Sequence, residues 1–205
     1  MIKLKKNNYT IYISEKEDGT ARDIKWFTYT NQVHGDNIAI FDEDQEFISS
    51  ENDAIISKRI GVKIWVLLAD CNGIVIMGKI RYGIVHAGWK WLKNGILSKT
   101  LHVLNELWED TSNLQIYVWP SIRKCCYEVG DEFIGYFDKK YFDRRDWKLY
   151  FDMIAMIRDI AWNEWIWQKN IEINEYCTAC SWRFFSYRRN NENKRITVAI
   201  KKNSI

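Results

Sequence analysis

The sequence has 205 residues, of which 47% are hydrophobic and 15% aromatic, so it can bury one sizeable core and is not disordered. Its 30 basic and 27 acidic residues are interspersed and leave a formal net charge of +3, which excludes the basic stripe of a nucleic-acid-binding protein. The most apolar run, residues 64–77, is interrupted by Asp70 and is shorter than the roughly 18 residues of a membrane-spanning helix, so we expect no membrane contact.

Short apolar or alternating runs predict β-strands at intervals along the chain. They cover residues 9–13, 38–41, 54–57, 62–69, 74–77, 82–85, 114–118, 184–187 and 196–200. Apolar residues at three- and four-residue intervals predict helices over residues 90–108, 129–137 and 151–167. Because strands outnumber helices and neighbouring strands are joined by few residues, we expect an α+β fold with a mixed sheet, as a single domain over residues 1–205.

The N-terminus and the cysteines both indicate a reducing compartment. The opening residues, MIKLKKNNYT, have no apolar stretch behind their lysines, so we expect no signal peptide. Five cysteines are an odd number, and without a secretory signal they do not indicate a disulfide framework. We therefore expect a cytoplasmic protein whose thiols are free for chemistry or metal binding.

Tryptophan is more frequent than glycine, at 11 residues against 10, although glycine averages about 7% of residues in proteins. Several tryptophans stand where a turn or a helix end favours glycine: Trp119 precedes Pro120, Trp147 lies in the polar string RRDWK, and Trp108 follows a predicted helix. We hypothesise that the gene uses a code in which UGA means glycine and that these codons are written here as tryptophan. The alternative is an unusually aromatic surface, and a UGG codon at position 119 would favour it.

Two of the three histidines stand at positions suited to chemistry. His34 and His86 each end an apolar stretch and precede a small residue, which allows close approach of a ligand. Cys71 lies between them in the chain, next to Asp70, where a predicted strand runs into a turn. Two histidines and one cysteine at three strand ends could form a three-ligand zinc site with a fourth position for water. Cys71 could equally be a small buried apolar residue, and His102, inside a predicted helix, is an ordinary surface residue.

The other cysteines form two local pairs. Cys177 and Cys180 have the C-x-x-C spacing of zinc and redox motifs, although a lone pair of this kind can also be structural. Cys125 and Cys126 are adjacent, and along a strand adjacent side chains point to opposite faces. We therefore expect at most one of these two thiols near any reaction centre.

Seven short motifs occur in the order typical of one protein family and span most of the chain. They are Gln-Val-His-Gly at 32–35, Asn-Asp-Ala at 52–54, Ala-Asp-Cys at 69–71, His-Ala-Gly-Trp at 86–89, Pro-Ser-Ile…Cys-Cys-Tyr-Glu-Val-Gly at 120–130, Cys-Thr at 177–178 and Phe-Phe-Ser-Tyr-Arg-Arg at 184–189. In these motifs the chain resembles the YfiH/laccase-domain family, also described as multicopper polyphenol oxidase-like, purine nucleoside phosphorylase-like and peptidoglycan editing factor proteins. The resemblance implies mixed β-sheet layers with flanking helices, in a YfiH-like fold shared with the cytotoxic necrotising factor toxin domain.

The resemblance also implies that His34, Cys71 and His86 bind a metal, which we expect to be zinc, with copper as the alternative. The chain departs from the family pattern at three places: Trp119 replaces the glycine of Gly-Pro-Ser-Ile, Lys90 and Trp91 replace Arg-Gly after His-Ala-Gly-Trp, and Lys194 precedes Arg195 in place of glycine. Two of these departures put tryptophan where the family has glycine, as the recoding hypothesis predicts. A Trp119 ring beside the pocket would hinder activity.

Phosphorolysis of a purine nucleoside is the reaction that the resemblance implies. Adenosine, inosine or methylthioadenosine would react with phosphate to give the free base and ribose 1-phosphate, with adenosine deamination as a companion activity. Cys71 and His86 would be catalytic, and the adjacent Asp70 would orient them. Arg188 and Arg189 would bind phosphate, or else form surface ion pairs, and we place Gln32 with them as a substrate-binding residue.

Three other functions remain open on the same residues. A Cys71–His86 pair is the arrangement of a cysteine hydrolase, and within this family it would act as an amidase that removes L-serine from UDP-N-acetylmuramate precursors. Copper-dependent polyphenol oxidation ranks last, because three ligands do not build a multicopper cluster. The domain could also be a zinc-stabilised binding module without turnover. The sequence does not define an oligomeric state.

Overall fold

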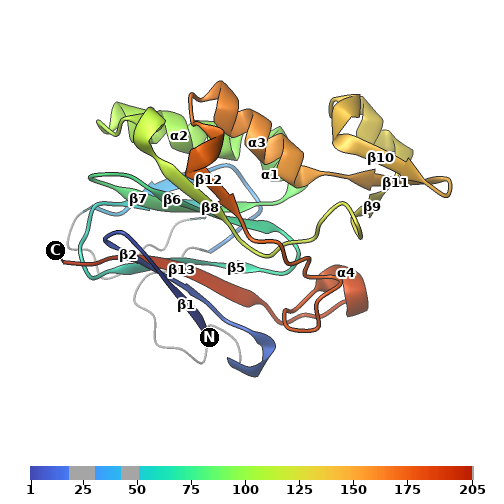
Figure 1. The fold of residues 1–205 in the computed structure, drawn as a ribbon, viewed down its shortest axis with the longest axis horizontal. Helices are drawn as coiled ribbons and strands as arrows, with labels where there is room; N and C mark the ends of the chain where they lie inside the picture. The colour runs from blue at the N-terminus through green and yellow to red at the C-terminus, as the bar shows by residue number, and fades with distance from the viewer. Residues whose placement is uncertain (19–30, 43–50, 205) are drawn as a thin grey trace.

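The computed structural model describes residues 1–18, 31–42 and 51–204 in three layers. A six-stranded sheet lies in the middle, with helices on one face and a four-stranded sheet on the other (Figure 1). No helix in these ranges is long and apolar enough to cross a bilayer. The α+β class and the mixed sheets expected from the sequence are confirmed.

The middle sheet has the strand order β12-β8-β6-β7-β4-β3. Its strands are β3 (Ile38–Ile40), β4 (Ala54–Ser57), β6 (Asn72–Met77), β7 (Tyr82–Ala87), β8 (Gln115–Val118) and β12 (Ile171–Ile173). The edge pairs β12–β8 and β3–β4 are parallel, and the central pairs are antiparallel. The second sheet has the order β1-β2-β13-β5 and is antiparallel, with β1 (Ile2–Lys6), β2 (Tyr9–Ile13), β5 (Lys63–Leu68) and β13 (Ile196–Lys202).

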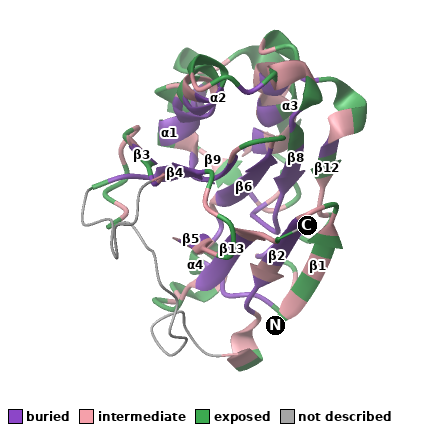
Figure 2. Cartoon of the chain, turned by 90° about the vertical axis from the view of Figure 1, so that its left-hand side faces the viewer, coloured by how far each residue is buried: buried purple, intermediate pink, exposed green. Residues whose placement is uncertain are grey.

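Successive side chains along the strands of the middle sheet point to opposite faces, so the hydrophobic core has two parts, one on each face of this sheet. On β7, Val85 and Ala87 pack with the helices, whereas Tyr82 and Ile84 pack against the second sheet. Both faces are apolar, so these strands read as continuous hydrophobic runs. Figure 2 shows the resulting buried strands between the two outer layers. By the same alternation, His86 shares its face with Tyr82 and Ile84 at the end of the strand.

The helices are shorter than the sequence predicts. The predicted helix over 90–108 is two helices, α1 (Trp89–Lys93) and α2 (Ile96–Glu106), because Gly95 adopts a left-handed conformation with φ 85° between them. The third is α3 (Met153–Asn163), which Asp152 caps by accepting from the backbone N–H of Ala155. The 3₁₀ helices are η1 (Lys16–Asp18), η3 (Thr111–Asn113), η4 (Asp131–Gly135), η5 (Lys139–Tyr141) and η6 (Gln168–Asn170).

Two predicted elements are wrong. Residues 184–187 are not a strand: Ser186 accepts from the backbone N–H of Arg189 and caps the short helix α4 (Tyr187–Asn190). Residues 129–137 contain only the 3₁₀ helix η4, and Val129 belongs to β9 (Glu128–Val129). This strand joins β10 (Phe142–Arg145) and β11 (Lys148–Phe151) in a third sheet of order β10-β11-β9, which the sequence patterns missed.

Three tryptophans have backbone conformations that favour glycine. Trp108, Trp147 and Trp165 have φ of 68°, 65° and 65°; the other positive-φ residues among the described non-glycines are Asn, Asp or His. Trp108 and Trp165 each follow the C-cap residue of a helix, Leu107 after α2 and Glu164 after α3. The bonds Glu109 N–H to Leu104 O and Ile166 N–H to Ala161 O, at 3.0 and 2.9 Å, complete the Schellman motifs in which glycine is usual at those positions.

Trp147 occupies the two-residue turn of the β10–β11 hairpin. Asp146 and Trp147 both have positive φ, at 47° and 65°, which is the type I′ geometry favoured by Asp-Gly. The three rings are 89, 95 and 79% exposed for Trp108, Trp147 and Trp165, so packing does not offset the backbone cost.

Replacing Trp108, Trp147 and Trp165 together with glycine is therefore expected to stabilise the protein. Each left-handed non-glycine residue costs about 1 kcal/mol, so the triple variant should gain roughly 3 kcal/mol in free energy of unfolding. Urea denaturation monitored by circular dichroism measures the change. Trp162→Gly is the matched control, because Trp162 lies within α3, where glycine destabilises by about 1 kcal/mol. A triple variant less stable than the parent would contradict the prediction.

Candidate functional site

His86 is held by strand pairing against a buried carboxylate. It is 3% exposed near the end of β7, and its Nδ1 lies 2.7 Å from the Oδ1 of Asp53. Its backbone N–H also donates to the carbonyl oxygen of Asp53 over 2.7 Å. Asp53 directly precedes β4, the antiparallel neighbour of β7, so the register of the two strands brings carboxylate and imidazole together. A carboxylate that accepts from Nδ1–H leaves Nε2 to accept a proton or to bind a metal.

His34 reaches the same place from the loop before β3. Its φ of 65° is left-handed, a conformation that histidine adopts more readily than most residues. The backbone N–H of the following residue, Gly35, donates to the Oδ2 of Asp53 over 2.7 Å. One carboxylate oxygen of Asp53 therefore holds the His34 loop and the other holds His86. The two imidazole centroids lie 5.6 Å apart.

Cys71 completes the group from the turn between β5 and β6. Its thiol is half-buried and lies close enough to His86 to raise the pKa of that imidazole. A Cβ added at Gly88 would lie 3.0 Å from the Sγ of Cys71, so a larger residue at this position would crowd the thiol. The structure thus places the imidazoles of His34 and His86 together with Asp53, and Cys71 lies next to His86. That His34, Cys71 and His86 bind a metal stays a prediction.

The two imidazoles have opposite electrostatic environments. Burial lowers the pKa of His86, but the charge of Cys71 and the hydrogen bonds of Asp53 and Cys71 outweigh burial and raise that pKa to about 9. Burial, followed by the charge of His86, lowers the pKa of His34. His34 therefore presents a neutral imidazole with a lone pair for a metal or a proton.

The donor set fits a zinc ion. One ligand atom from each of His34, Asp53 and His86 lies within 4.8 Å of the others, and Cys71 adjoins His86. Two imidazoles and a thiolate are ligands that Zn²⁺ binds with a fourth position open, and copper accepts the same donors. Asp53 is the residue whose role sequence reasoning missed. The sequence feature that could have identified Asp53 is its position directly before the apolar run Ala-Ile-Ile. An acid at such a position becomes fully buried, and a buried carboxylate needs a partner.

Replacing Asp53 with asparagine should weaken metal binding by about 10- to 100-fold, because an amide holds the His86 imidazole less firmly than a carboxylate does. Competition with a chromophoric chelator measures the affinity. Asp36→Asn is the matched control, since Asp36 lies on the loop that carries His34 and pairs with the exposed Lys99. Equal metal affinity in the Asp53→Asn and Asp36→Asn variants would contradict the role given to Asp53.

Asp70, predicted as catalytic, has contacts that favour a positioning role. Its Oδ1 accepts from the Thr178 hydroxyl over 2.5 Å, and its Oδ2 accepts from the Ser186 hydroxyl and the Arg188 backbone N–H over 3.1 and 2.7 Å. Asp70 itself has a left-handed φ of 78°. Its carboxylate therefore fastens the turn that carries Cys71 to the C-terminal segment.

Two residues predicted to bind substrate are engaged within the fold. The guanidinium of Arg189 donates to three backbone carbonyl oxygens of residues 178–184 at 2.7–3.0 Å, and its side chain is only 9% exposed. The Gln32 side chain donates to the carbonyl oxygen of Leu67 over 2.9 Å and accepts from the backbone N–H of Leu67 over 2.7 Å. The Arg189 guanidinium therefore holds the loop of residues 178–184, and the Gln32 amide holds the edge of β5. Both groups bond within the fold and not to a ligand.

Arg188 instead lines a cleft of about 630 Å³. Its guanidinium donates to the carbonyl oxygen of Glu128 over 2.5 Å and lies over the Tyr127 ring at 5.2 Å. Trp89 and Phe133, with ring centroids 4.6 Å apart, line the same cleft. Burial and then the charge of Cys71 raise the pKa of Tyr127. The backbone N–H of Arg188 donates to the carboxylate of Asp70, the neighbour of Cys71, and so links the cleft to the turn that carries this thiol. The cleft combines aromatic faces with a cation beside the candidate metal site.

The tryptophan ring at the histidines is that of Trp91. Its centroid lies 4.8 Å from that of His34 and 4.9 Å from that of His86, and its Nε1 is buried without a hydrogen-bond partner among the described residues. Trp119, which the sequence placed beside the pocket, is fully buried between the two main sheets against Tyr117. Trp91, and not Trp119, is therefore the tryptophan ring that stands against the candidate ligands His34 and His86.

Comparison with solved structures bears out the expected fold. YlmD from Geobacillus stearothermophilus superposes with a TM-score of 0.85 at 18% identity, over 97% of this chain and 93% of that one. The hypothetical protein YfiH from Bacillus licheniformis superposes with a TM-score of 0.83 at 19% identity, over 95% of this chain and 93% of that one.

Comparison of sequences places the chain among enzymes named for nucleoside reactions. A purine nucleoside phosphorylase of Aquifex aeolicus is 39% identical over 174 residues, which cover 82% of this chain and 79% of the relative. A protein named adenosine deaminase RL5, from an unknown prokaryotic organism, is 29% identical over 178 residues, covering 77% and 68%. The model of the multi-copper polyphenol oxidoreductase laccase family matches residues 13–201, and the chain belongs to this family.

Proposed function

We propose that this protein is a zinc-dependent purine nucleoside phosphorylase that also deaminates adenosine. The relatives named for these two reactions support a role in nucleoside chemistry. The observation that carries the proposal is the grouping of His34, His86 and Asp53, with Cys71 next to His86, in a chain that also has a cleft with both aromatic faces and a cation. A purine has a flat apolar face, and phosphate needs a cationic partner, so the cleft suits both substrates.

His34, Cys71 and His86 would hold the metal, with Asp53 fixing the proton on Nδ1 of His86. A bound zinc ion supplies Lewis-acid chemistry, which polarises a substrate oxygen or lowers the pKa of a water toward 7. Trp89 and Phe133 would stack on the purine, and Arg188 would bind phosphate oxygens as a planar guanidinium. The protonated Tyr127 hydroxyl can donate a hydrogen bond to a substrate oxygen at the junction of cleft and metal ligands.

Product analysis tests the proposal. The zinc-loaded protein, as the parent chain and as a Trp91→Gly variant, is incubated with adenosine with and without phosphate, and products are separated by chromatography. We expect adenine and ribose 1-phosphate only when phosphate is present, and inosine in both conditions. The absence of all three products from the zinc-loaded Trp91→Gly variant would overturn the proposal.

A cysteine hydrolase is the second candidate, because one observation favours it. Cys71, His86 and Asp53 form a chain of contacts from thiol to imidazole to carboxylate, which is the order of nucleophile, base and orienting group. On this reading the protein would be the amidase acting on UDP-N-acetylmuramate carrying L-serine. Release of serine by metal-free protein, and its loss after alkylation of Cys71, would favour the amidase over the phosphorylase.

A further inference from the structure

Four cysteines that the proposed reaction does not use converge at one place. The Sγ atoms of Cys125, Cys126, Cys177 and Cys180 all lie within 4.8 Å of one another, and all four are free thiols. Cys180 Sγ is 3.6 Å from Cys125 Sγ and 3.0 Å from Cys126 Sγ. Four thiolates bound to one zinc at about 2.3 Å stand about 3.8 Å apart, so these positions need only small shifts to hold the ion.

The backbone explains how adjacent cysteines can share one site. Cys125 and Cys126 lie in a turn, not in a strand, and the backbone N–H groups of Cys126 and Tyr127 both donate to the carbonyl oxygen of Arg123 at 2.9 Å. The expectation that at most one of the pair lies near the reaction centre assumed a strand. The backbone is a turn instead, and it brings both thiols to this cluster. The C-x-x-C pair sits in a second turn, closed by the backbone N–H of Ser181 donating to the carbonyl oxygen of Cys177 over 2.9 Å.

A backbone donor reaches the sulfur of Cys177. The backbone N–H of Arg123 donates to its Sγ over 3.4 Å. Arg123 lies two residues before Cys125, so this contact ties the turn that carries Cys125 and Cys126 to the turn that carries Cys177 and Cys180.

A buried cation offsets the negative charge that four thiolates would bring. The Arg123 guanidinium is fixed by bonds to the Ser121 hydroxyl and to the carbonyl oxygens of Trp119 and Asn174, at 2.8, 3.0 and 2.5 Å. A guanidinium carries a positive charge in proteins, and these bonds hold that of Arg123 beside the cysteines.

We propose that Cys125, Cys126, Cys177 and Cys180 form a structural tetrathiolate zinc site, separate from the His34–Cys71–His86 group. Binding would release the thiol protons as the four Zn–S bonds form and leave no open position for substrate. The ion would join the segment before β9, which carries Tyr127, to the segment that carries Thr178 and leads to Arg188. Because Cys126 lines the cleft itself, the ion would fix two of its walls.

Zinc counting on the full chain separates the two sites. The His34→Ala/His86→Ala double variant, which removes two ligands of the other site, is expected to retain one zinc per chain by mass spectrometry of the metal. Adding Cys177→Ser and Cys180→Ser should remove that zinc and lower the melting temperature by about 10 °C. Cys71→Ser is the matched control: it removes the one cysteine outside the cluster and should keep the charge-transfer spectrum of a Co²⁺ tetrathiolate.

Two results together would overturn the proposal. The His34→Ala/His86→Ala variant would hold no zinc, and its four cluster cysteines would react as free thiols or be recovered as disulfides. This outcome leaves the phosphorylase proposal standing, because nucleoside turnover is measured separately.

A second, independent observation concerns the tryptophans at positive φ. Trp108, Trp147 and Trp165 occupy two Schellman motifs and a type I′ turn, three positions whose geometry favours glycine. Trp91 and Trp119 are buried with an Nε1 that has no partner among the described residues. The 10 glycines and these five positions make 15 of 205 residues, about 7%, which is the average usage.

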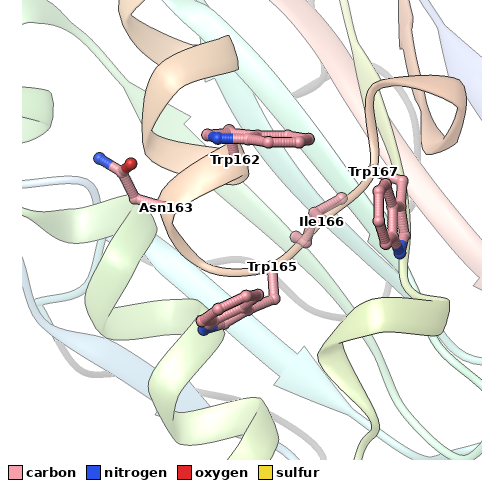
Figure 3. A pocket seen from close by; sticks show the side chains of 5 residues that line it. All are labelled: Trp162, Asn163, Trp165, Ile166 and Trp167. Atoms are coloured by element: carbon pink, nitrogen blue, oxygen red, sulfur yellow. The ribbon is translucent and has the colours of Figure 1, made fainter.

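The surface around Trp165 supports the same inference. A cavity of about 330 Å³ is lined by Trp162, Asn163, Trp165, Ile166 and Trp167 at the end of α3. Figure 3 shows that its walls are three indole rings, which project from one short stretch of chain. Glycine at position 165 would remove one wall, so the cavity is a product of the tryptophans themselves.

We infer that positions 91, 108, 119, 147 and 165 are glycine in the native protein, encoded by UGA. Sequencing the gene, with tandem mass spectrometry of the protein from its own cells, tests this. We expect UGA at the five codons, glycine in the corresponding peptides, and tryptophan encoded by UGG at position 89, which packs on Phe133. UGG codons, or tryptophan in the peptides, at positions 108, 147 and 165 would overturn the inference.

Discussion

Replacing Trp91 with glycine is expected to raise kcat/KM for adenosine phosphorolysis by about 100-fold. The indole is 7% exposed and stands against both His34 and His86, so a nucleoside must displace it to reach the metal ligands. Moving a buried aromatic side chain into water costs up to about 3 kcal/mol. That free energy corresponds to roughly a hundredfold in kcat/KM when it is removed from the barrier.

Steady-state kinetics of the zinc-loaded parent and variant measure the gain, with the zinc content of each determined in parallel. Trp167→Gly is the control, because Trp167 is 55% exposed at the start of η6 and should leave kcat/KM unchanged. An unchanged kcat/KM in the Trp91→Gly variant, with zinc still bound, would show that the indole does not obstruct the site.

The sequence predicted those strands whose residues are mostly apolar and buried. Tyr9–Ile13 and Ala54–Ser57 have the predicted bounds, because their burial follows from composition alone. β10 and β11 were missed because their hairpin is largely polar and its turn reads Asp-Trp, which hides the Asp-Gly signal of a type I′ turn. The break between α1 and α2 depends on Gly95, and a glycine inside a helical pattern does not by itself show whether the helix ends there.

The sequence singled out the residues of the candidate metal site, whereas the contacts that organise them could not be predicted. His34, Cys71 and His86 stand out because each lies at the end of an apolar run. Asp53 acquires its role only through the register of β4 and β7, which places its carboxylate against His86. Arg188 and Arg189 are neighbours of the same type, yet α4 turns one guanidinium into the carbonyl oxygens of its own loop and the other into the cleft. Such a difference between adjacent side chains can be predicted only when the local backbone conformation is known.

His86→Ala should reduce phosphorolysis at least about 1,000-fold, measured in the Trp91→Gly background so that access does not limit the rate. The substitution removes a metal ligand and leaves the buried carboxylate of Asp53 without its imidazole partner. Lewis-acid stabilisation by a metal is worth several kcal/mol, and about 4 kcal/mol corresponds to a factor of 1,000. His102→Ala is the matched control, since His102 is on the exposed face of α2, with Nε2 3.0 Å from Glu164.

Zinc content distinguishes the two readings of His86. If His86 is a ligand, the variant should lose one equivalent of zinc together with its activity, and the cysteine cluster should keep its own zinc. The variant should also unfold at a lower temperature, because the buried Asp53 carboxylate loses its partner. If the variant keeps all its zinc and loses activity, His86 serves Cys71 as a base, and the hydrolase becomes the better function. Retention of both zinc and activity would show that His86 has no part in the reaction, and its buried contact with Asp53 would then have no catalytic role.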